Sequence, residues 1–131
     1  NSHCFSADVN AAFDPIYGEV HERRNASYIN YGVVVTKYTG ARGKAGTNDA
    51  TAEMMGFARR ILDAEHVGWQ TGELGKVDQG GGGTIAKYMA NRNIDTIDAG
   101  VPVMSMHAPF EVVAKFDCFM TYLGVLAAYK A

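Results

Sequence analysis

Hydrophobic and polar positions along the chain follow two periods, one typical of strands and one typical of helices. β-Branched and aromatic residues dominate residues 32–39 between two glycines, which predicts a strand, followed by a loop rich in glycine and lysine at 40–46. Residues 50–64 show apolar positions at spacings of three and four, which predicts a helix capped by Asn48 or Asp49. Its predicted core face holds Met54, Phe57, Ala58, Ile61 and Leu62.

The remaining pattern continues to alternate between strand and helix. It predicts strands at 66–71 and 94–97, a helix at 84–91, and a long apolar helix at 109–130 with Pro109 in its first turn. Such an alternation predicts an α/β fold, with helices on the faces of a layered sheet and ligand-binding loops at the strand ends. Without a repeat or a convincing linker, residues 1–131 are predicted to form one unit.

Composition and charge exclude several classes of partner. The 131 residues are 47% hydrophobic and carry a net charge of −2 spread along the chain, so neither nucleic acid nor an anionic membrane surface is expected as a partner. Apolar stretches fall short of the roughly 20 residues that span a bilayer. The two cysteines, Cys4 and Cys118, lack CxxC spacing, and a reducing cytoplasm is the expected location.

Two polar residues stand where strands are expected to end. Asp8 follows a short apolar stretch and His107 follows the apolar run 101–104. Carboxylate and imidazole are ligand types that zinc uses in hydrolases, so the two residues suggest half of a metal site. Taken singly, a structural histidine and a capping aspartate are commoner roles. Since no HExxH or paired-cysteine motif supplies a third ligand, the residues alone leave both interpretations open.

Four consecutive glycines, residues 80–83, precede the predicted helix at 84–91. Glycine lets a ligand approach the main chain closely, which favours a shaped functional loop over a merely flexible turn. The spacing matches neither GxxxxGK[ST] nor GxGxxG, so a nucleotide-binding loop is the less favoured alternative. Lys37 and Lys76 flank predicted loops, where lysines are mostly solvated surface residues.

Four blocks, in order, resemble the M18 metallo-aminopeptidases, especially the bacterial aminopeptidase I-like branch. They are Ser-Ala-Asp-Val-Asn-Ala-Ala (6–12), Ala-Ser-Tyr-Ile-Asn-Tyr-Gly-Val-Val-Val-Thr-Lys-Tyr-Thr-Gly (26–40), Trp-Gln-Thr-Gly-Glu-Leu-Gly-Lys-Val-Asp-Gln-Gly-Gly-Gly-Gly-Thr-Ile-Ala-Lys-Tyr (69–88) and Ser-Met-His-Ala-Pro-Phe-Glu (105–111). The resemblance implies a three-layer α/β/α fold, with residues 1–131 as the carboxyl-terminal part of a catalytic domain that a second, mainly β domain interrupts in the full protein.

The resemblance also implies a reaction, the removal of the amino-terminal residue from a peptide by two zinc ions, or by Mn²⁺ or Co²⁺ in their place. Asp8 and His107 match the ligands of the Ser-Ala-Asp and Ser-Met-His motifs and would serve different ions. The remaining ligands, including a bridging aspartate, and the general-base glutamate belong upstream of the Ser-Ala-Asp motif. This stretch by itself is therefore expected to be inactive.

Substrate contacts are implied for Lys37, Gly81, Gly82 and Thr84. Eukaryotic members selective for acidic residues have a histidine three positions after the ligand aspartate, where this chain has Ala11. A neutral or hydrophobic amino-terminal residue is therefore expected, and bulk at Gly81 or Gly82 is expected to lower activity. The family also forms closed homo-oligomers of up to twelve subunits. Two alternatives remain, a noncatalytic binding or assembly module and a nucleotide-binding domain that uses glycines 80–83.

Overall fold

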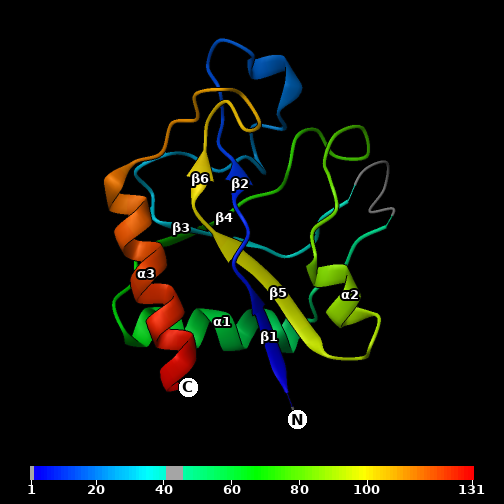
Figure 1. Cartoon of the computed structure of the whole chain (residues 1–131), viewed down its shortest axis with the longest axis vertical. Coiled ribbons are helices and arrows are strands. Elements are labelled where there is room, and N and C mark those ends of the chain that lie inside the picture. The colour runs from blue at the N-terminus through cyan, green and yellow to red at the C-terminus, as the bar shows by residue number, and fades with distance from the viewer. Residues whose placement is uncertain (1, 41–45) are drawn as a thin grey trace.

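A mixed four-stranded sheet forms the centre of the molecule (Figure 1). The computed structural model describes residues 2–40 and 46–131, so most of the predicted loop at 40–46 lies outside the described residues. In spatial order the strands are β1 (His3–Ser6), β5 (Asp95–Gly100), β3 (Val33–Thr36) and β4 (Trp69–Thr71). β1 runs parallel to β5, β5 antiparallel to β3, and β3 parallel to β4.

Two short strands form a separate sheet beyond the ends of β1 and β5. β2 (Asn10–Ala11) and β6 (Pro102–Val103) pair in parallel, with Asn10 opposite Pro102. A single-turn 3₁₀ helix, Gly18–Val20, lies in the long connection between β2 and β3. The stretch from β1 to β2 and the stretch from β5 to β6 therefore run side by side in parallel. Asp8 lies between β1 and β2, and His107 follows β6.

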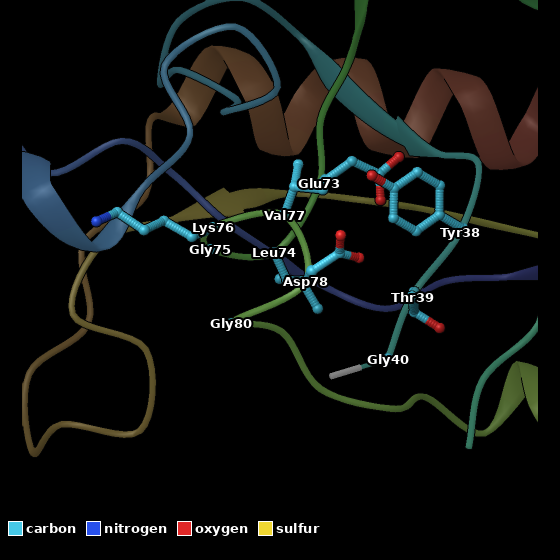
Figure 2. Close-up of a pocket in the computed structure, with 10 residues that line it drawn as sticks. All are labelled: Tyr38, Thr39, Gly40, Glu73, Leu74, Gly75, Lys76, Val77, Asp78 and Gly80. Carbon is cyan, nitrogen blue, oxygen red and sulfur yellow. The ribbon is translucent and has the colours of Figure 1, made fainter. Parts of the chain in front are cut away.

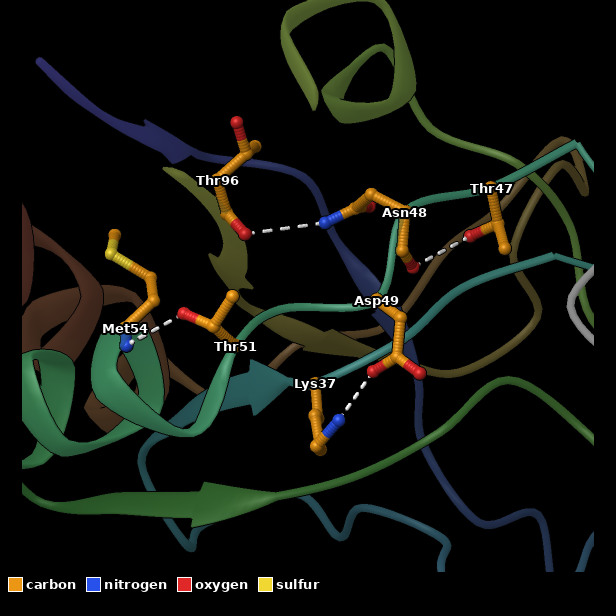
Figure 3. Close-up of polar contacts among 7 residues, drawn as sticks. All are labelled: Lys37, Thr47, Asn48, Asp49, Thr51, Met54 and Thr96. Carbon is orange, nitrogen blue, oxygen red and sulfur yellow. Dashed lines mark hydrogen bonds and ion pairs between the residues drawn. The ribbon is translucent and has the colours of Figure 1, made fainter. Parts of the chain in front are cut away.

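One face of the sheet packs against the two longer helices, α1 (Ala52–Ala64) and α3 (Lys115–Lys130). The predicted core face of α1 is confirmed, because Met54, Ala58 and Leu62 are buried and Phe57 and Ile61 pack beside them. The predicted cap was wrong. Thr51 caps the helix by accepting the Met54 N–H at 3.2 Å, whereas the Asn48 amide donates to the Thr96 carbonyl (Figure 3).

The helix predicted at 109–130 begins at Lys115 instead, so the placement of Pro109 in its first turn was wrong. Met104 and Val112 exchange two backbone hydrogen bonds of 2.9 and 3.1 Å as an antiparallel bridge, which keeps residues before 114 out of the helix. Gly124 lies where α3 crosses α1, since a Cβ there would stand 3.2 Å from Leu62 Cδ2. The glycine that weakens the helix thus allows the close approach of the two helices.

The opposite face of the sheet is more polar and is covered by α2 (Ala86–Ala90) and the segment before it. Side chains alternate along β5, so Ile97 and Ala99 enter the core with α1 while Thr96 and Asp98 point to the α2 side. α2 is shorter than the predicted 84–91 and leaves Thr84 in the preceding loop. Helices on both sheet faces confirm the predicted three-layer α/β arrangement.

Across residues 2–40 and 46–131, none of the helices combines the length and the apolar character needed to cross a bilayer.

Candidate functional site

Asp8 lies in the break between β1 and β2, with its main chain directly against β5. A Cβ on Gly100 would stand 1.8 Å from the Asp8 carbonyl oxygen, so only glycine fits opposite it. The Asp8 carboxylate accepts the Val9 N–H at 2.8 Å, and the side chain is partly exposed. The backbone contact with β5 therefore sets the position of Asp8 at the end of its strand, where the sequence predicted it.

Asn10 holds the segment that follows Asp8. Its side-chain amide donates to Thr36 Oγ1 and accepts the Ser27 hydroxyl, both at 2.9 Å, and all three side chains are buried. Thr36 ends β3, so this network joins the Asp8 segment to the strand that leads into Lys37. Sequence reasoning missed this network, since an isolated Asn, Ser and Thr carry no recognisable spacing.

His107 lies in an exposed turn beyond β6. Ser105 and His107 have φ angles of 57° and 69°, in the left-handed region that non-glycine residues seldom adopt. The His107 N–H donates to Glu111 Oε1 at 2.5 Å, and the Met104–Val112 bridge closes the base of the loop. These contacts stabilise a turn that presents the imidazole after the strand, as predicted from the apolar run 101–104.

Asp8 and His107 supply one oxygen and one nitrogen donor, which suit zinc in type, and both side chains reach the surface. No hydrogen bond or ion pair joins them in the described part of the chain, and among those residues no three His, Cys, Asp or Glu side chains gather into a potential metal site. A catalytic zinc usually has three protein ligands. The two residues fit as contributors to a metal site that needs further ligands.

The glycine segment, residues 80–83, runs beside the end of β3. Gly81 has φ +103°, and a Cβ there would stand 2.3 Å from the Gly40 carbonyl oxygen, while the Gly82 carbonyl accepts the Gly40 N–H at 2.7 Å. Among the described residues, no heavy atom lies within 4 Å of a Cβ built on Gly82. Gly81 is therefore required by the fold, whereas no described residue would clash with a side chain at Gly82.

A cavity of about 60 Å³ opens between the residues after β3 and the loop that leads to the glycine segment. Tyr38 and Gly40 lie on one side of it, and Leu74, Asp78 and Gly80 on the other. Figure 2 shows the Asp78 carboxylate directed from its loop toward the side of Tyr38, with Lys76 pointing the other way. This volume suits water or a small polar group better than a whole side chain.

Thr84 and Asp98 connect the glycine segment to the sheet. The Thr84 hydroxyl donates to Asp98 Oδ2 at 3.0 Å and accepts the Ala86 N–H at 3.2 Å, and Asp98 is only 3% exposed. Burial raises the pKa of the Asp98 carboxyl, as does the nearby Asp8 charge, while the Ser6 and Thr84 hydroxyls lower it. Thr84, predicted as a substrate contact, is thus largely buried with its hydroxyl engaged.

Asp98 was missed by the sequence reasoning because the predicted strand at 94–97 ended one residue before it, whereas β5 continues to Gly100. The available signal was an acidic residue between the apolar residues Ile97 and Ala99. Charged groups are rarely buried without a specific partner, so an acid inside an apolar run marks a position worth examining.

Lys37, the other predicted substrate contact, follows β3 and forms an ion pair with Asp49 (Figure 3). Both side chains are exposed, so this pair contributes little to stability. Asp49 offsets the positive charge of Lys37.

Known proteins resemble this chain over nearly its whole length. The family model described as aminopeptidase I zinc metalloprotease (M18) matches residues 1–129. The probable M18 family aminopeptidase 1 of Clostridium acetobutylicum is 54% identical over 127 residues, and that of Thermotoga maritima is 52% identical over 124 residues. The alignments cover 97% and 95% of this chain but 27% and 28% of those relatives. The chain spans little more than a quarter of their length.

Solved structures agree. The aminopeptidase I of Clostridium acetobutylicum superposes with a TM-score of 0.92 over 97% of this chain and 28% of its own. The M18 aminopeptidase of Thermotoga maritima gives 0.90 at 51% identity, over 94% of this chain and 27% of its own. The mApe1 dodecamer of S. cerevisiae, at 17% identity and a TM-score of 0.73, shares the fold. The chain therefore belongs to the M18 family of aminopeptidase I zinc metalloproteases.

Proposed function

We propose that the protein of which this chain is a part removes amino-terminal residues from peptides, with Asp8 and His107 each serving as a ligand of one ion in a two-zinc site. The observation that carries the proposal is that one strand, β5, in a chain of this family contacts both Asp8, through Gly100, and Thr84, the residue after the glycine segment, through Asp98. Two zinc ions, when bound, polarise the scissile carbonyl and lower the pKa of water.

The residues of this chain have separable roles in the proposal. The contact of Asp8 with Gly100 and the Asn10 network orient the carboxylate, so that little rearrangement is needed to bind metal. Gly82 lets substrate approach the main chain, since no Cβ intervenes there. Each group contributes binding or orientation, and the general base is proposed to come from a part of the protein outside this span.

A neutral or hydrophobic amino-terminal residue is the proposed substrate preference. Asp49 pairs with Lys37 and offsets the charge that would attract an acidic side chain, and Ala11 lacks a basic group. Tyr38, Leu74 and the Asp78 carboxylate line the neighbouring cavity, and the negative charge of Asp78 would disfavour an acidic side chain there. We further propose that the intact enzyme forms closed homo-oligomers, as in the dodecameric fold relative, and acts on cytoplasmic peptides without a nucleic-acid or membrane partner.

The activity is tested with the full-length enzyme on leucine and glutamate p-nitroanilides. We expect faster release from leucine, loss of activity on chelation, and recovery with Zn²⁺, Mn²⁺ or Co²⁺. Asp8→Ala and His107→Ala should each lower kcat/KM at least a hundredfold, about 2.7 kcal/mol, whereas the exposed control Lys130→Ala should leave it unchanged. Full activity after complete metal removal would contradict the proposal.

The isolated span offers a second test, because each ion would keep one protein ligand from it. We expect no aminopeptidase activity and zinc affinity weaker than micromolar, since a catalytic zinc usually needs three protein ligands. Titration calorimetry with zinc measures this affinity. Submicromolar binding that is lost in both Asp8→Ala and His107→Ala would show that the span holds a complete site.

A further inference from the structure

Asp98 is a buried acid in a position that stability alone does not explain. It is 3% exposed, and no lysine or arginine pairs with it among the described residues. Among the described residues its Oδ1 atom forms no hydrogen bond of good geometry, although the Ser6 hydroxyl on the paired strand lies near enough to lower the Asp98 pKa, while Oδ2 accepts the Thr84 hydroxyl. Burying a carboxyl group without compensation is costly, and such groups concentrate at functional sites.

The residues around Asp98 join two parts of the proposed site. Asp98 and Gly100 project from the same face of β5, two positions apart. Gly100 receives the main chain of Asp8, and Asp98 holds Thr84, the residue directly after the glycine segment. One face of one strand therefore sets the spacing between the metal-ligand segment and the glycine segment.

The glycine segment has a second fixed point at its other side. The Gly40 N–H donates to the Gly82 carbonyl at 2.7 Å, and the Gly40 carbonyl oxygen closely faces Gly81. Four glycines in succession hold their own conformation poorly, because each has wide backbone freedom. Among the described residues, the Thr84–Asp98 bond is the side-chain hydrogen bond that fixes the end of this segment to the sheet, beside the packing of α2 on β5.

We propose that Asp98 is a positioning residue of the aminopeptidase site, which holds the glycine segment at a defined place beside Asp8 through its hydrogen bond with Thr84. The inference rests on the proposed function and assigns Asp98 no contact with substrate or metal. Thr84 accordingly acts through the loop that it anchors, and the substrate meets the main chain near Gly82.

Variants that separate the hydroxyl from the shape of residue 84 test the proposal in the full-length enzyme. Thr84→Val keeps the shape and loses the bond, and it should lower kcat/KM at least tenfold, mainly through a raised KM, with zinc content unchanged. Thr84→Ser keeps the hydroxyl and should stay within threefold of wild type. At the other end of the bond, Asp98→Asn keeps an acceptor and should resemble wild type, while Asp98→Ala should resemble Thr84→Val.

Thr96→Val is the matched control. Thr96 lies on the same face of β5, is buried to the same degree, and donates its hydroxyl to the Ile94 carbonyl at 2.8 Å, away from the glycine segment. Loss of this hydrogen bond in Thr96→Val should lower the free energy of unfolding without changing KM. Hydrogen exchange followed by mass spectrometry gives a readout that is independent of activity, and peptides covering residues 78–88 should exchange faster in Thr84→Val but not in Thr96→Val.

The outcomes distinguish this inference from the proposed function. A wild-type enzyme without metal-dependent aminopeptidase activity would overturn the proposed function, whatever the variants do. An active wild type with unchanged KM and unchanged exchange in Thr84→Val would overturn the role of Asp98 alone. If Asp98→Ala does not fold, Thr84→Val and Thr84→Ser still decide, because they leave the carboxyl group in place.

Discussion

Gly81 and Gly82 are neighbours in the chain, yet their surroundings set different limits on a side chain. Bulk at Gly81 meets the Gly40 carbonyl in a backbone region with positive φ, whereas bulk at Gly82 meets none of the described residues. A loss of activity at Gly81 therefore cannot be separated from damage to the fold, while Gly82 reports on the ligand side alone.

We expect Gly82→Val in the full-length enzyme to lower kcat/KM at least tenfold, about 1.4 kcal/mol, with zinc content and Tm close to wild type. Gly81→Val should instead lower Tm, because the Cβ clashes with backbone. Steady-state kinetics and thermal unfolding of both variants measure the difference. Wild-type kinetics in Gly82→Val would reduce the glycine segment to a structural turn.

At the scale of single residues, His21 is expected to make the free energy of unfolding depend on pH. Its Nε2 accepts the Asp14 N–H at 3.3 Å, and burial lowers the pKa of the imidazole, partly opposed by the Asp14 charge. The His21 imidazole binds a proton less readily in the folded state than in the unfolded state. The free energy of unfolding should therefore decrease as the pH falls from 6.5 toward the lowered pKa of the folded state.

Urea unfolding above and below pH 6.5 measures this contribution. We expect His21→Gln to remove part of the acid destabilisation, while His66→Gln, at an exposed position, serves as the control and retains it. An identical pH profile for wild type and His21→Gln would contradict the assignment.

At the scale of elements, a buried carboxylate joins the start of α3 to the segment before β3. Asp117, in the first turn of α3, accepts the N–H groups of Asn30 and Gly32, both at 2.7 Å, just before β3 begins. The far end of the same helix carries an exposed ion pair, Lys130 to Glu65 at 2.8 Å. One contact is a buried carboxylate that accepts two backbone N–H groups, and the other is an exposed ion pair between side chains.

Asp117→Ala should lower the free energy of unfolding by about 3 kcal/mol, because it leaves backbone N–H groups without their charged acceptor. Lys130→Ala should cost less than about 1 kcal/mol, since exposed ion pairs contribute little. Denaturant unfolding of the two variants gives both values. Equal losses would show that burial does not distinguish these contacts.

At the scale of the whole molecule, β1 is an edge strand, paired with β5 alone in the described part of the chain. A hollow of about 650 Å³ lies beside it, lined by residues of β1 and by apolar residues of α2, α3 and the segment before β5, including Cys4, Met89, Ile94 and Val125. An open edge next to apolar surface is a template for another strand. In the longer relatives three quarters of the chain lies outside this span, which makes such an edge expected here.

We therefore expect the isolated 131-residue chain to self-associate as its concentration rises. Cys4→Lys, which places a charge in the hollow beside β1, should weaken association, whereas Cys118→Lys on the exposed side of α3 should not. Multi-angle light scattering over a concentration series measures the mass. A wild-type chain that stays monomeric at high concentration would exclude association through this edge.

The sequence by itself determined the elements whose signal is local. The periodicity of 50–64 predicted α1 and its buried face, because a helix repeats its environment every three to four residues. The β-branched run predicted β3, and the order of the four sequence blocks predicted the family. Asp8 and His107 followed from the same blocks, and their roles as metal ligands stay predictions.

Only the tertiary structure decided what depends on partners distant in sequence. The start of α3 depends on the pairing of Met104 with Val112. Thr51 caps α1 in place of the predicted Asn48, because the Asn48 side chain donates to the Thr96 carbonyl on β5. The link from Thr84 to Asp98 spans fourteen residues and joins a loop to a buried strand. Such contacts leave no period in the sequence, since the free energy that selects them arises only when burial removes water from both groups.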